Sequence, residues 1–349
     1  MNHSTQRYVL GLDGGGSKTE CVLVREDGLI CGRGRGGGVN RNFVSDLELE
    51  RSVSDALNGA LKGQAHVRRI ESIIGSMSCD SAALQAFAAQ YQVDPARIEW
   101  VGEALPARVM SEVVYGQAPE VVIVAGTGSL AAGWLPDGGQ RTVGGAGSTI
   151  GDEGSAYWIG LRALRRLVHA FDGREPFDSF AESLCETLAI PNLSVLINRV
   201  YGGGKRPMSR DEIAGIAVAV CRLAEAGDPF AHALFEEAAH ELAMQINTLI
   251  RLLGVQGAPV RILPYGGVFR SGALILEPLK RAVCEYAPQA QFLPPLRCTV
   301  IGSAAMALRA IGVDPTQQET RDHLVNGARE YDLIYWTLAD SHEANGPPG

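Results

Sequence analysis

Three features that mark particular classes of protein are absent from this 349-residue chain. It has no excess of basic residues: 31 lysines and arginines face 39 aspartates and glutamates, which gives a formal net charge of −8. Proteins that bind nucleic acids or anionic membranes usually carry the opposite sign, so we expect neither partner. No window approaches the ~18–20 uncharged apolar residues of a membrane span, and the opening MNHSTQRYVL lacks the apolar core of a signal peptide. These absences predict a cytoplasmic protein.

Cysteine is present but lacks the spacing of a metal site or a disulfide framework. The seven cysteines are widely scattered, and no two of them form a CxxC pair. An odd number at such spacing is typical of reduced, mostly buried thiols. We therefore expect neither a zinc site nor a set of disulfide bonds.

Two glycine-rich turns share one pattern. The first, in Asp13–Thr19, follows the apolar run Tyr8–Leu12, and the second, Gly126–Ser129, follows the apolar run Val121–Ala125. Each turn leads into another apolar run and then into an Asp-Gly pair, so each unit is predicted to be a β-hairpin. The repetition indicates two related lobes that hold one polyphosphate.

The chemistry of these turns suits a phosphate; a single such turn is more often a plain hairpin, but the pairing of two favours phosphate binding. Glycine lets backbone N–H groups approach an anion, and the hydroxyls add donors without bulk. Lys18 either neutralises a phosphate or is a solvated strand residue, and Asp13 is well placed to hold Mg²⁺ through water. The GxxxxGK[ST] spacing of a Walker A loop is absent. The candidate phosphate-binding residues are Gly14, Gly15, Gly16, Ser17, Lys18, Thr19, Gly126, Thr127, Gly128 and Ser129.

Two further glycine-rich segments are candidate ligand loops. Gly144–Gly160 places Asp152 and Glu153 among glycines before an apolar helix. Helix capping would explain the polar residues, but it would not explain the glycines. In Tyr265–Gly272 a Gly-Gly pair joins a strand to a helix, where it either admits a flat ligand such as a nucleobase or forms an ordinary turn.

The order of elements indicates an α/β protein. Short apolar strands alternate with amphipathic helices in the first third of the chain, and residues 156–253 are mostly helical. Residues 32–38 are expected to form a glycine-rich loop. The predicted domains are an N-terminal lobe of residues 1–117, a C-terminal lobe of residues 118–315 with a helical insertion, and a tail of residues 316–349. Within the tail, residues 324–338 are expected to form an amphipathic helix before a disordered end.

The motifs DGGGSKT, AGTGS, GDEGSAYWIG and GGVFRSG, in this order and spacing, resemble those of the N-acetylglucosamine kinase and BadF/BadG/BcrA/BcrD ATPase group. That group belongs to the sugar kinase, actin and Hsp70 superfamily, and the resemblance extends from about Tyr8 to Ala310. It implies two ribonuclease H-like lobes of the actin-type ATPase, with a nucleotide cleft between them. It also implies ATP, Mg²⁺ and an amino sugar as ligands, and we expect a homodimer.

The resemblance assigns roles to individual residues. Asp13 would lie near Mg²⁺, and the two glycine turns would hold the phosphates. Asn40 and Asp80 would line the sugar site. Gly145 and Asp152 would hold the hydroxyl and N-acetyl groups of the amino sugar. The residues matching the adenosine motif are Gly266, Gly267, Arg270 and Ser271.

Two residues depart from the family pattern. Glu103 stands where the family has an aspartate as general base, and its carboxylate lies one methylene further from the backbone. Ala146 stands where relatives often carry tryptophan, which widens the expected sugar pocket. The favoured hypothesis is an ATP-dependent kinase that phosphorylates the 6-hydroxyl of N-acetylglucosamine or glucosamine, with Glu103 binding the sugar and accepting its proton.

Two alternatives remain open. The first is an ATPase of the dehydratase-activator type, but such proteins have a cysteine just before the second turn, where this chain has Val124 and Ala125. The second is a sugar or nucleotide sensor that keeps the binding site without catalysis, a hypothesis suggested by Glu103.

Overall fold

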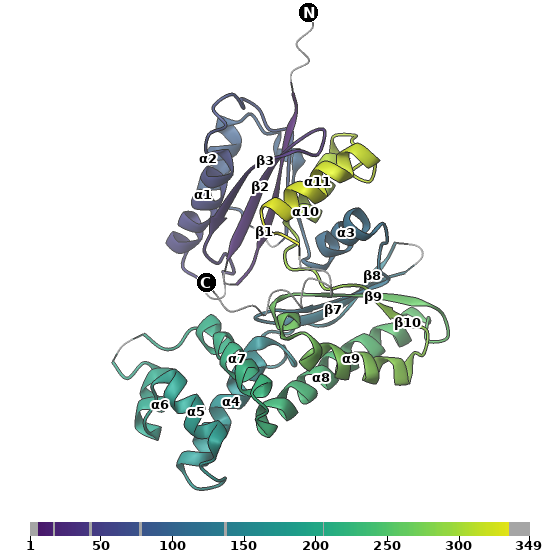
Figure 1. Cartoon of the computed structure of the whole chain (residues 1–349). Coiled ribbons are helices and arrows are strands. Elements are labelled where there is room, and N and C mark those ends of the chain that lie inside the picture. The colour runs from purple at the N-terminus through teal and green to yellow at the C-terminus, as the bar shows by residue number, and fades with distance from the viewer. Residues whose placement is uncertain are drawn as a thin grey trace, which may run out of the picture. The chain divides into compact units, whose positions relative to one another are not determined.

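The chain folds into two compact units, each described here by itself. The computed structural model describes residues 6–16, 18–41, 44–76, 79–135, 138–204 and 206–334. Within these ranges, the first unit contains residues 6–119 and 293–334, and the second contains residues 120–292 (Figure 1). The chain therefore leaves the first unit once and returns to it.

The first unit is a five-stranded sheet in the order β3-β2-β1-β4-β5. Strands β1, β2 and β3 are antiparallel, whereas β4 and β5 run parallel to β1. Helix α1 packs on β3 and β2, and α10 packs on β1, β4 and α3 (Figure 1). The elements are β1 (Tyr8–Gly14), β2 (Thr19–Arg25), β3 (Ile30–Gly36), α1 (Asp46–Leu61), β4 (Ser72–Ser76), α2 (Ala82–Gln90), β5 (Ile98–Val101), α3 (Ala104–Tyr115), α10 (Val300–Ala310) and α11 (Gln318–Glu330).

The second unit repeats this sheet. Its order is β8-β7-β6-β9-β10, with β6, β7 and β8 antiparallel and with β9 and β10 parallel to β6. The strands are β6 (Val121–Ala125), β7 (Ser129–Trp134), β8 (Gln140–Gly144), β9 (Val260–Tyr265) and β10 (Ala290–Phe292). In both units the predicted glycine turn joins the first two strands of the sheet, so both hairpins are confirmed.

The predicted helical segment of the second unit is also confirmed. Ser209 forms a capping box with Glu212, and Asp228 caps the helix that begins at Pro229. The helices are α4 (Ala156–Phe171), α5 (Ser179–Leu188), α6 (Leu193–Tyr201), α7 (Arg210–Glu225), α8 (Pro229–Leu253) and α9 (Ala273–Tyr286). Among the described helices, no single one is long and apolar enough to cross a membrane, while the bent pair α5 and α6 passes that test by length and composition together.

The glycine-rich segment after the first hairpin is a strand, which corrects the expected loop over residues 32–38. Its glycines alternate along β3 and face α1. A Cβ atom on Gly34 would lie 1.8 Å from the carbonyl oxygen of Ala56, and one on Gly32 would lie 2.1 Å from that of Ala60. The absence of side chains on this face allows the helix backbone to lie directly on the strand. The glycines thus serve packing, which a loop prediction overlooks.

The C-terminal part of the chain belongs to the first unit, although residues 293–315 were expected in the second lobe. Helix α10 has a surface of small residues that fits closely against this unit. A Cβ atom on Gly302 would lie 1.8 Å from the carbonyl oxygen of Pro106, and one on Gly11 would lie 2.5 Å from the backbone nitrogen of Ala304. Such close backbone contacts require both partners to be small, so this helix fits the face of β1.

Helix α11 lies earlier in the tail than expected. It ends at Glu330 instead of continuing to residue 338, and it packs on α3 and β3. Arg321 donates hydrogen bonds to the carbonyl oxygens of Val113 and Val114, at 2.7 and 3.1 Å. Residues 335–349 lie outside the described residues, as does Ser17 of the first glycine turn.

Candidate active site

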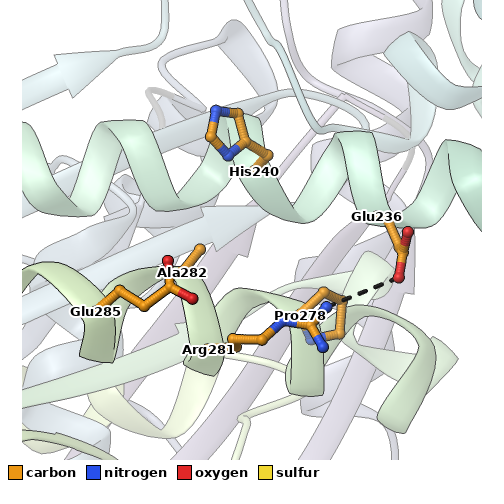
Figure 2. Close-up of a pocket in the computed structure, with 6 residues that line it drawn as sticks. All are labelled: Glu236, His240, Pro278, Arg281, Ala282 and Glu285. Atoms are coloured by element: carbon orange, nitrogen blue, oxygen red, sulfur yellow. Dashed lines mark ion pairs between the residues drawn. The ribbon is translucent and has the colours of Figure 1, made fainter.

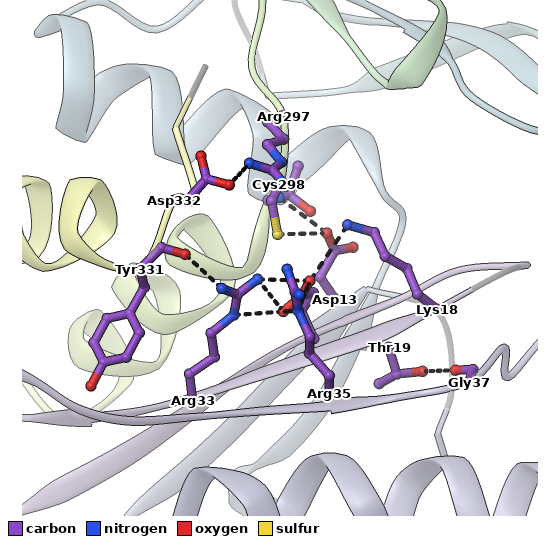
Figure 3. Close-up of polar contacts among 12 residues, drawn as sticks. Asp13, Lys18, Thr19, Arg33, Arg35, Gly37, Arg297, Cys298, Tyr331 and Asp332 are labelled. Carbon is purple, nitrogen blue, oxygen red and sulfur yellow. Dashed lines mark hydrogen bonds and ion pairs between the residues drawn. The ribbon is translucent and has the colours of Figure 1, made fainter. Parts of the chain in front are cut away.

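Asp13 occupies the end of β1 and is held from three sides. Its side chain is buried, and its Oδ1 accepts a hydrogen bond of 2.7 Å from the Ser76 hydroxyl. Its Oδ2 accepts one of 3.1 Å from the backbone N–H of Thr299 and a contact of 3.5 Å from the Cys298 thiol (Figure 3). Burial raises the pKa of Cys298, so this thiol stays protonated and donates. The carboxylate of Asp13 is therefore fixed in orientation.

The donor set around Asp13 fits a magnesium ion carried by a nucleotide. Among the described residues, no three histidine, cysteine, aspartate or glutamate side chains are grouped to hold a metal ion. Mg²⁺ commonly uses one or two protein carboxylates together with water and substrate phosphates. A single fixed carboxylate at the end of a strand meets that requirement.

A backbone hydrogen bond closes the first turn, and the side chains of Lys18 and Thr19 point to different places. The N–H of Gly15 donates to the carbonyl oxygen of Lys18 at 2.9 Å. Thr19 is fully buried, and its hydroxyl donates to the carbonyl oxygen of Gly37 at 2.8 Å (Figure 3). This hydroxyl, predicted to bind phosphate, is directed at the unit's own backbone. Lys18 is half exposed and lies 3.5 Å from the Glu20 carboxylate.

Glu20, which sequence reasoning missed, organises the positive charge beside this turn. It is almost completely buried and receives both Arg33 and Arg35, with closest N–O distances of 2.9 and 3.0 Å. Burial raises the pKa of Glu20, but the hydrogen bonds and charge of Arg33 outweigh burial, and the pKa is lowered. Arg33 also donates to the carbonyl oxygen of Tyr331 (Figure 3). The alternating Arg-Gly-Arg sequence of β3 was the available signal for this network.

Three predicted residues gather at one edge of the first sheet. Strands β1, β4 and β5 are parallel, and in their register Asp13 lies opposite Ser76, which lies opposite Val101. The chain segments that follow β4 and β5 carry Asp80 and Glu103. The carboxyl ends of these strands therefore bring the three carboxyl residues to the same edge, as in other open α/β sheets.

The sugar-binding candidates of the first unit are also close neighbours. Asn40 lies before α1, and its carbonyl oxygen accepts the N–H of Val44 at 3.1 Å. The adjacent Arg41 donates to the carbonyl oxygen of Asp80 and pairs with Asp46 at 3.0 Å. Arg41 thus links the Asn40 segment to the Asp80 segment. Glu103 begins α3 but does not cap it with its side chain.

In the second unit, Ser129 repeats the position of Thr19. It begins β7, is buried, and donates its hydroxyl to the carbonyl oxygen of Glu153 at 2.6 Å. Gln245 of α8 donates to the same hydroxyl at 3.3 Å. Each of these two hydroxyls therefore anchors the chain segment that follows the third strand of its sheet. In the second turn, the glycines and Thr127 are half-exposed.

The Gly144–Gly160 segment wraps around this second turn. The N–H of Gly145 donates to the carbonyl oxygen of Ser129 at 3.0 Å. Asp152 is buried with a left-handed backbone, φ 61°, and its Oδ1 accepts the N–H of Ser129 at 3.2 Å. Its Oδ2 forms an ion pair with Arg210, a residue that the sequence motifs did not reveal. Asp152, predicted to bind sugar, thus supports the backbone of the second glycine turn.

The predicted adenosine motif lies beside the same turn. Gly266 has a left-handed backbone, φ 118°, and a Cβ atom there would lie 2.5 Å from the carbonyl oxygen of Ala125. Only glycine lets the backbone at residue 266 come this close to Ala125, because the strands β9 and β6 that lead to these two residues are parallel neighbours. Gly267 and Arg270 are exposed, and Ser271 hydrogen-bonds the Cys221 thiol of α7.

A cavity of about 220 Å³ lies elsewhere, between α8 and α9 (Figure 2). Charged and apolar side chains line it together, and Arg281 and Glu236 face each other there at 3.7 Å. None of the predicted site residues lines it, so it is separate from the glycine turns. Its lining residues are Glu236, His240, Pro278, Arg281, Ala282 and Glu285.

Comparison with known proteins identifies relatives of one kind. A model of the BadF/BadG/BcrA/BcrD ATPase family matches residues 10–306. An N-acetylmuramic acid/N-acetylglucosamine kinase of Clostridium acetobutylicum is 26% identical over 271 residues, which cover 76% of this chain and 86% of that protein. An N-acetyl-D-glucosamine kinase of Dictyostelium discoideum is 25% identical over 318 residues, which cover 88% of this chain and 99% of that protein.

A solved structure shares the architecture. A protein of Chromobacterium violaceum, described as a candidate N-acetylglucosamine kinase, superposes with a TM-score of 0.63 at 21% identity. The superposition covers 86% of this chain and 99% of that chain. The likeness shows the fold: α/β, with the two lobes found in sugar kinases.

Proposed function

Because the chain belongs to the BadF/BadG/BcrA/BcrD ATPase family, we propose that it is a sugar kinase that uses ATP. In its finer form, the proposal is transfer of the γ-phosphoryl group to the 6-hydroxyl of N-acetylglucosamine or glucosamine. Relatives named as kinases of N-acetylated amino sugars support this substrate class. The observation that supports the proposal is the shared carboxyl edge of β1, β4 and β5: Asp13 lies at the end of β1, and Asp80 and Glu103 lie in the segments that follow β4 and β5.

The proposed roles of the residues follow from their positions. Backbone N–H groups of each glycine turn bind phosphate groups of ATP, and Lys18 adds positive charge. Asp13 would hold Mg²⁺, which would supply positive charge at the phosphates. The Gly266–Ser271 segment, whose glycine backbone approaches β6, receives the adenosine.

Glu103 accepts the proton of the attacking sugar hydroxyl in this proposal. It lies two residues after β5, at the N-cap position of α3, where its side chain makes no capping hydrogen bond. Asn40, Asp80, Gly145 and Asp152 bind the sugar. Phosphoryl transfer depends chiefly on positioning. General-base catalysis typically adds about 10²–10⁴-fold, so removing the base should lower the rate by that factor.

The test measures ADP release by the purified protein with Mg·ATP and a panel of sugars. We expect release only with an amino sugar, and none with its 6-deoxy analogue. Glu103→Gln should lower the rate of transfer by about 10²–10⁴-fold while ATP still binds, because the amide cannot accept the proton. Glu99→Gln on the exposed face of β5 is the matched control and should retain activity.

Sugar-independent ATP turnover would contradict the kinase proposal and favour an ATPase of the activator type. Tight sugar binding without ADP release would favour a sensor. Full activity of Glu103→Gln would assign the proton transfer to another group at this edge, with Asp80 the first to examine. The expected cytoplasmic location and homodimer stay predictions, and light scattering on the purified protein measures the latter.

A further inference from the structure

Helix α7 begins against the second glycine turn, and its first two residues both contact this region. Arg210 is the first residue of the helix, and its Nη2 forms an ion pair with Oδ2 of Asp152. Asp211 follows, and its Oδ1 accepts a hydrogen bond of 3.3 Å from the Thr127 hydroxyl. Two adjacent residues of a helix distant in sequence therefore reach the Gly126–Ser129 turn.

The Arg210 guanidinium lies directly over the turn. A Cβ atom on Gly128 would lie 2.5 Å from Nη2 of Arg210 and 2.8 Å from Oδ1 of Asp152. A Cβ atom at position 128 would therefore force the side chains of this ion pair to shift. The side chains of Arg210 and Asp152 are only 13% and 5% exposed, so the two charges have little contact with water.

Asp152 connects the arginine to the turn. One of its carboxylate oxygens accepts the Ser129 N–H, and the other receives Arg210. Its backbone φ of 61° is uncommon for a residue other than glycine, and such conformations persist where surrounding contacts hold them. Without Arg210, a buried carboxylate would lose its counter-charge and would be driven toward water. The Ser129 N–H would then lose its acceptor.

We infer that Arg210 is a positioning residue for phosphoryl transfer. It holds Asp152 and, through Asp152, keeps the Gly126–Ser129 turn in the geometry that binds phosphate. The Thr127–Asp211 contact attaches the same turn to α7 at a second point. This inference rests on the proposed function, because it gives the braced turn its role in the reaction.

We expect position 210 to need arginine and not lysine, because arginine has a planar, forked donor group. A guanidinium presents several donors in fixed directions, whereas a lysine ammonium is a compact point charge on a flexible chain. Arg210→Lys should therefore retain the counter-charge of Asp152 but position the turn less well. Its activity should lie between that of the unmodified protein and that of Arg210→Ala.

The test combines kinetics with hydrogen exchange. Arg210→Ala should lower kcat/KM by about 10- to 100-fold, since a displacement of ~1 Å costs on the order of 10²-fold in rate. Low, non-denaturing concentrations of guanidinium chloride should restore part of the activity. Exchange at the Ser129 amide should become faster than in the unmodified protein. Arg162→Ala, which breaks an ion pair with Glu237 between two exposed side chains of the same unit, is the control and should change neither measurement.

Several outcomes would overturn the inference. Unchanged kinetics and unchanged exchange in Arg210→Ala would exclude the positioning role. Lost activity with unchanged exchange and no guanidinium rescue would mean that Arg210 acts by direct contact with a ligand. If Arg210→Ala fails to fold, Arg210→Lys must show the intermediate activity and faster exchange, and unmodified behaviour would refute the inference. If the unmodified protein transfers no phosphoryl group to a sugar, the proposed function fails, whereas the exchange result still decides whether Arg210 braces the turn.

Discussion

Carboxylates of the first unit have very different surroundings, and these surroundings suit them to different proposed roles. Asp13 is buried and accepts contacts from Ser76, Cys298 and Thr299. Glu103 is half-buried at the start of a helix that it does not cap. A fixed carboxylate suits metal binding, and one on the sheet edge suits proton transfer. Glu20 has neither role, because it is engaged by arginines on β3.

At this scale Glu20 provides a prediction on stability. Glu20→Gln would leave the mostly buried Arg33 without its counter-charge, and breaking a buried pair on one side costs roughly 3–5 kcal/mol. Because Lys18 and Arg35 are more exposed, we expect a loss near the lower end, about 3 kcal/mol. Urea unfolding at neutral pH, followed by circular dichroism, measures this change in the free energy of unfolding.

The same variant tests the pH dependence. The pKa of Glu20 is lowered in the folded protein, so its stabilising contribution is present above the ordinary glutamate pKa and is lost as the pH falls through the lowered value. The difference in stability between the unmodified protein and Glu20→Gln should therefore shrink on acidification. A difference that grows at low pH would contradict the assigned sign.

Among the elements, β3 shows how glycine can specify a packed strand. Gly32, Gly34 and Gly36 face α1, while Arg33 and Arg35 on the opposite face reach Glu20. Glycine in a strand is normally unfavourable, but here it removes the side chains that would separate the helix from the strand. The backbone contact between α1 and β3 compensates for the low strand propensity.

Gly34→Ala tests this packing. The new Cβ atom would lie 1.8 Å from the carbonyl oxygen of Ala56, so α1 and β3 must move apart. Overpacking of this kind costs typically 1–3 kcal/mol, and we expect about 3 kcal/mol because the obstacle is backbone. Thermal unfolding measures the effect. Gly257→Ala, where a Cβ atom would meet nothing within 4 Å, should leave the melting temperature nearly unchanged.

Across the described residues, two copies of one sheet topology occur, and the segments 6–119 and 293–334 belong to the same unit. Helix α10 covers β1 and supplies Thr299 to Asp13 from the segment just before it. Helix α11 completes the first unit through contacts with α3 and β3. The proposed metal carboxylate therefore depends on residues from both ends of the chain.

Removing the chain after Gly312 should loosen the first unit selectively. The deletion takes away the Arg321 bonds to α3, the Tyr331 carbonyl that receives Arg33, and the contact of His323 with the Asp27 carbonyl oxygen at 2.8 Å. Hydrogen exchange should increase in β3 and at the end of α3. Exchange in β6 and β9 should stay as in the full chain. An equal increase in both units would contradict the division into separate compact units.

By itself, the sequence determined the two hairpins, the glycine turns between their strands, the helix Asp46–Leu61 and the family. These features depend on local order: apolar periodicity, capping residues and glycine at turns act within a few residues. Only the tertiary structure decided that β3 is a strand, that residues 293–315 return to the first unit, and that Thr19 and Ser129 direct their hydroxyls to backbone. It also brought Arg210 to Asp152. These outcomes depend on contacts between distant segments, for which no short stretch of sequence carries a signal.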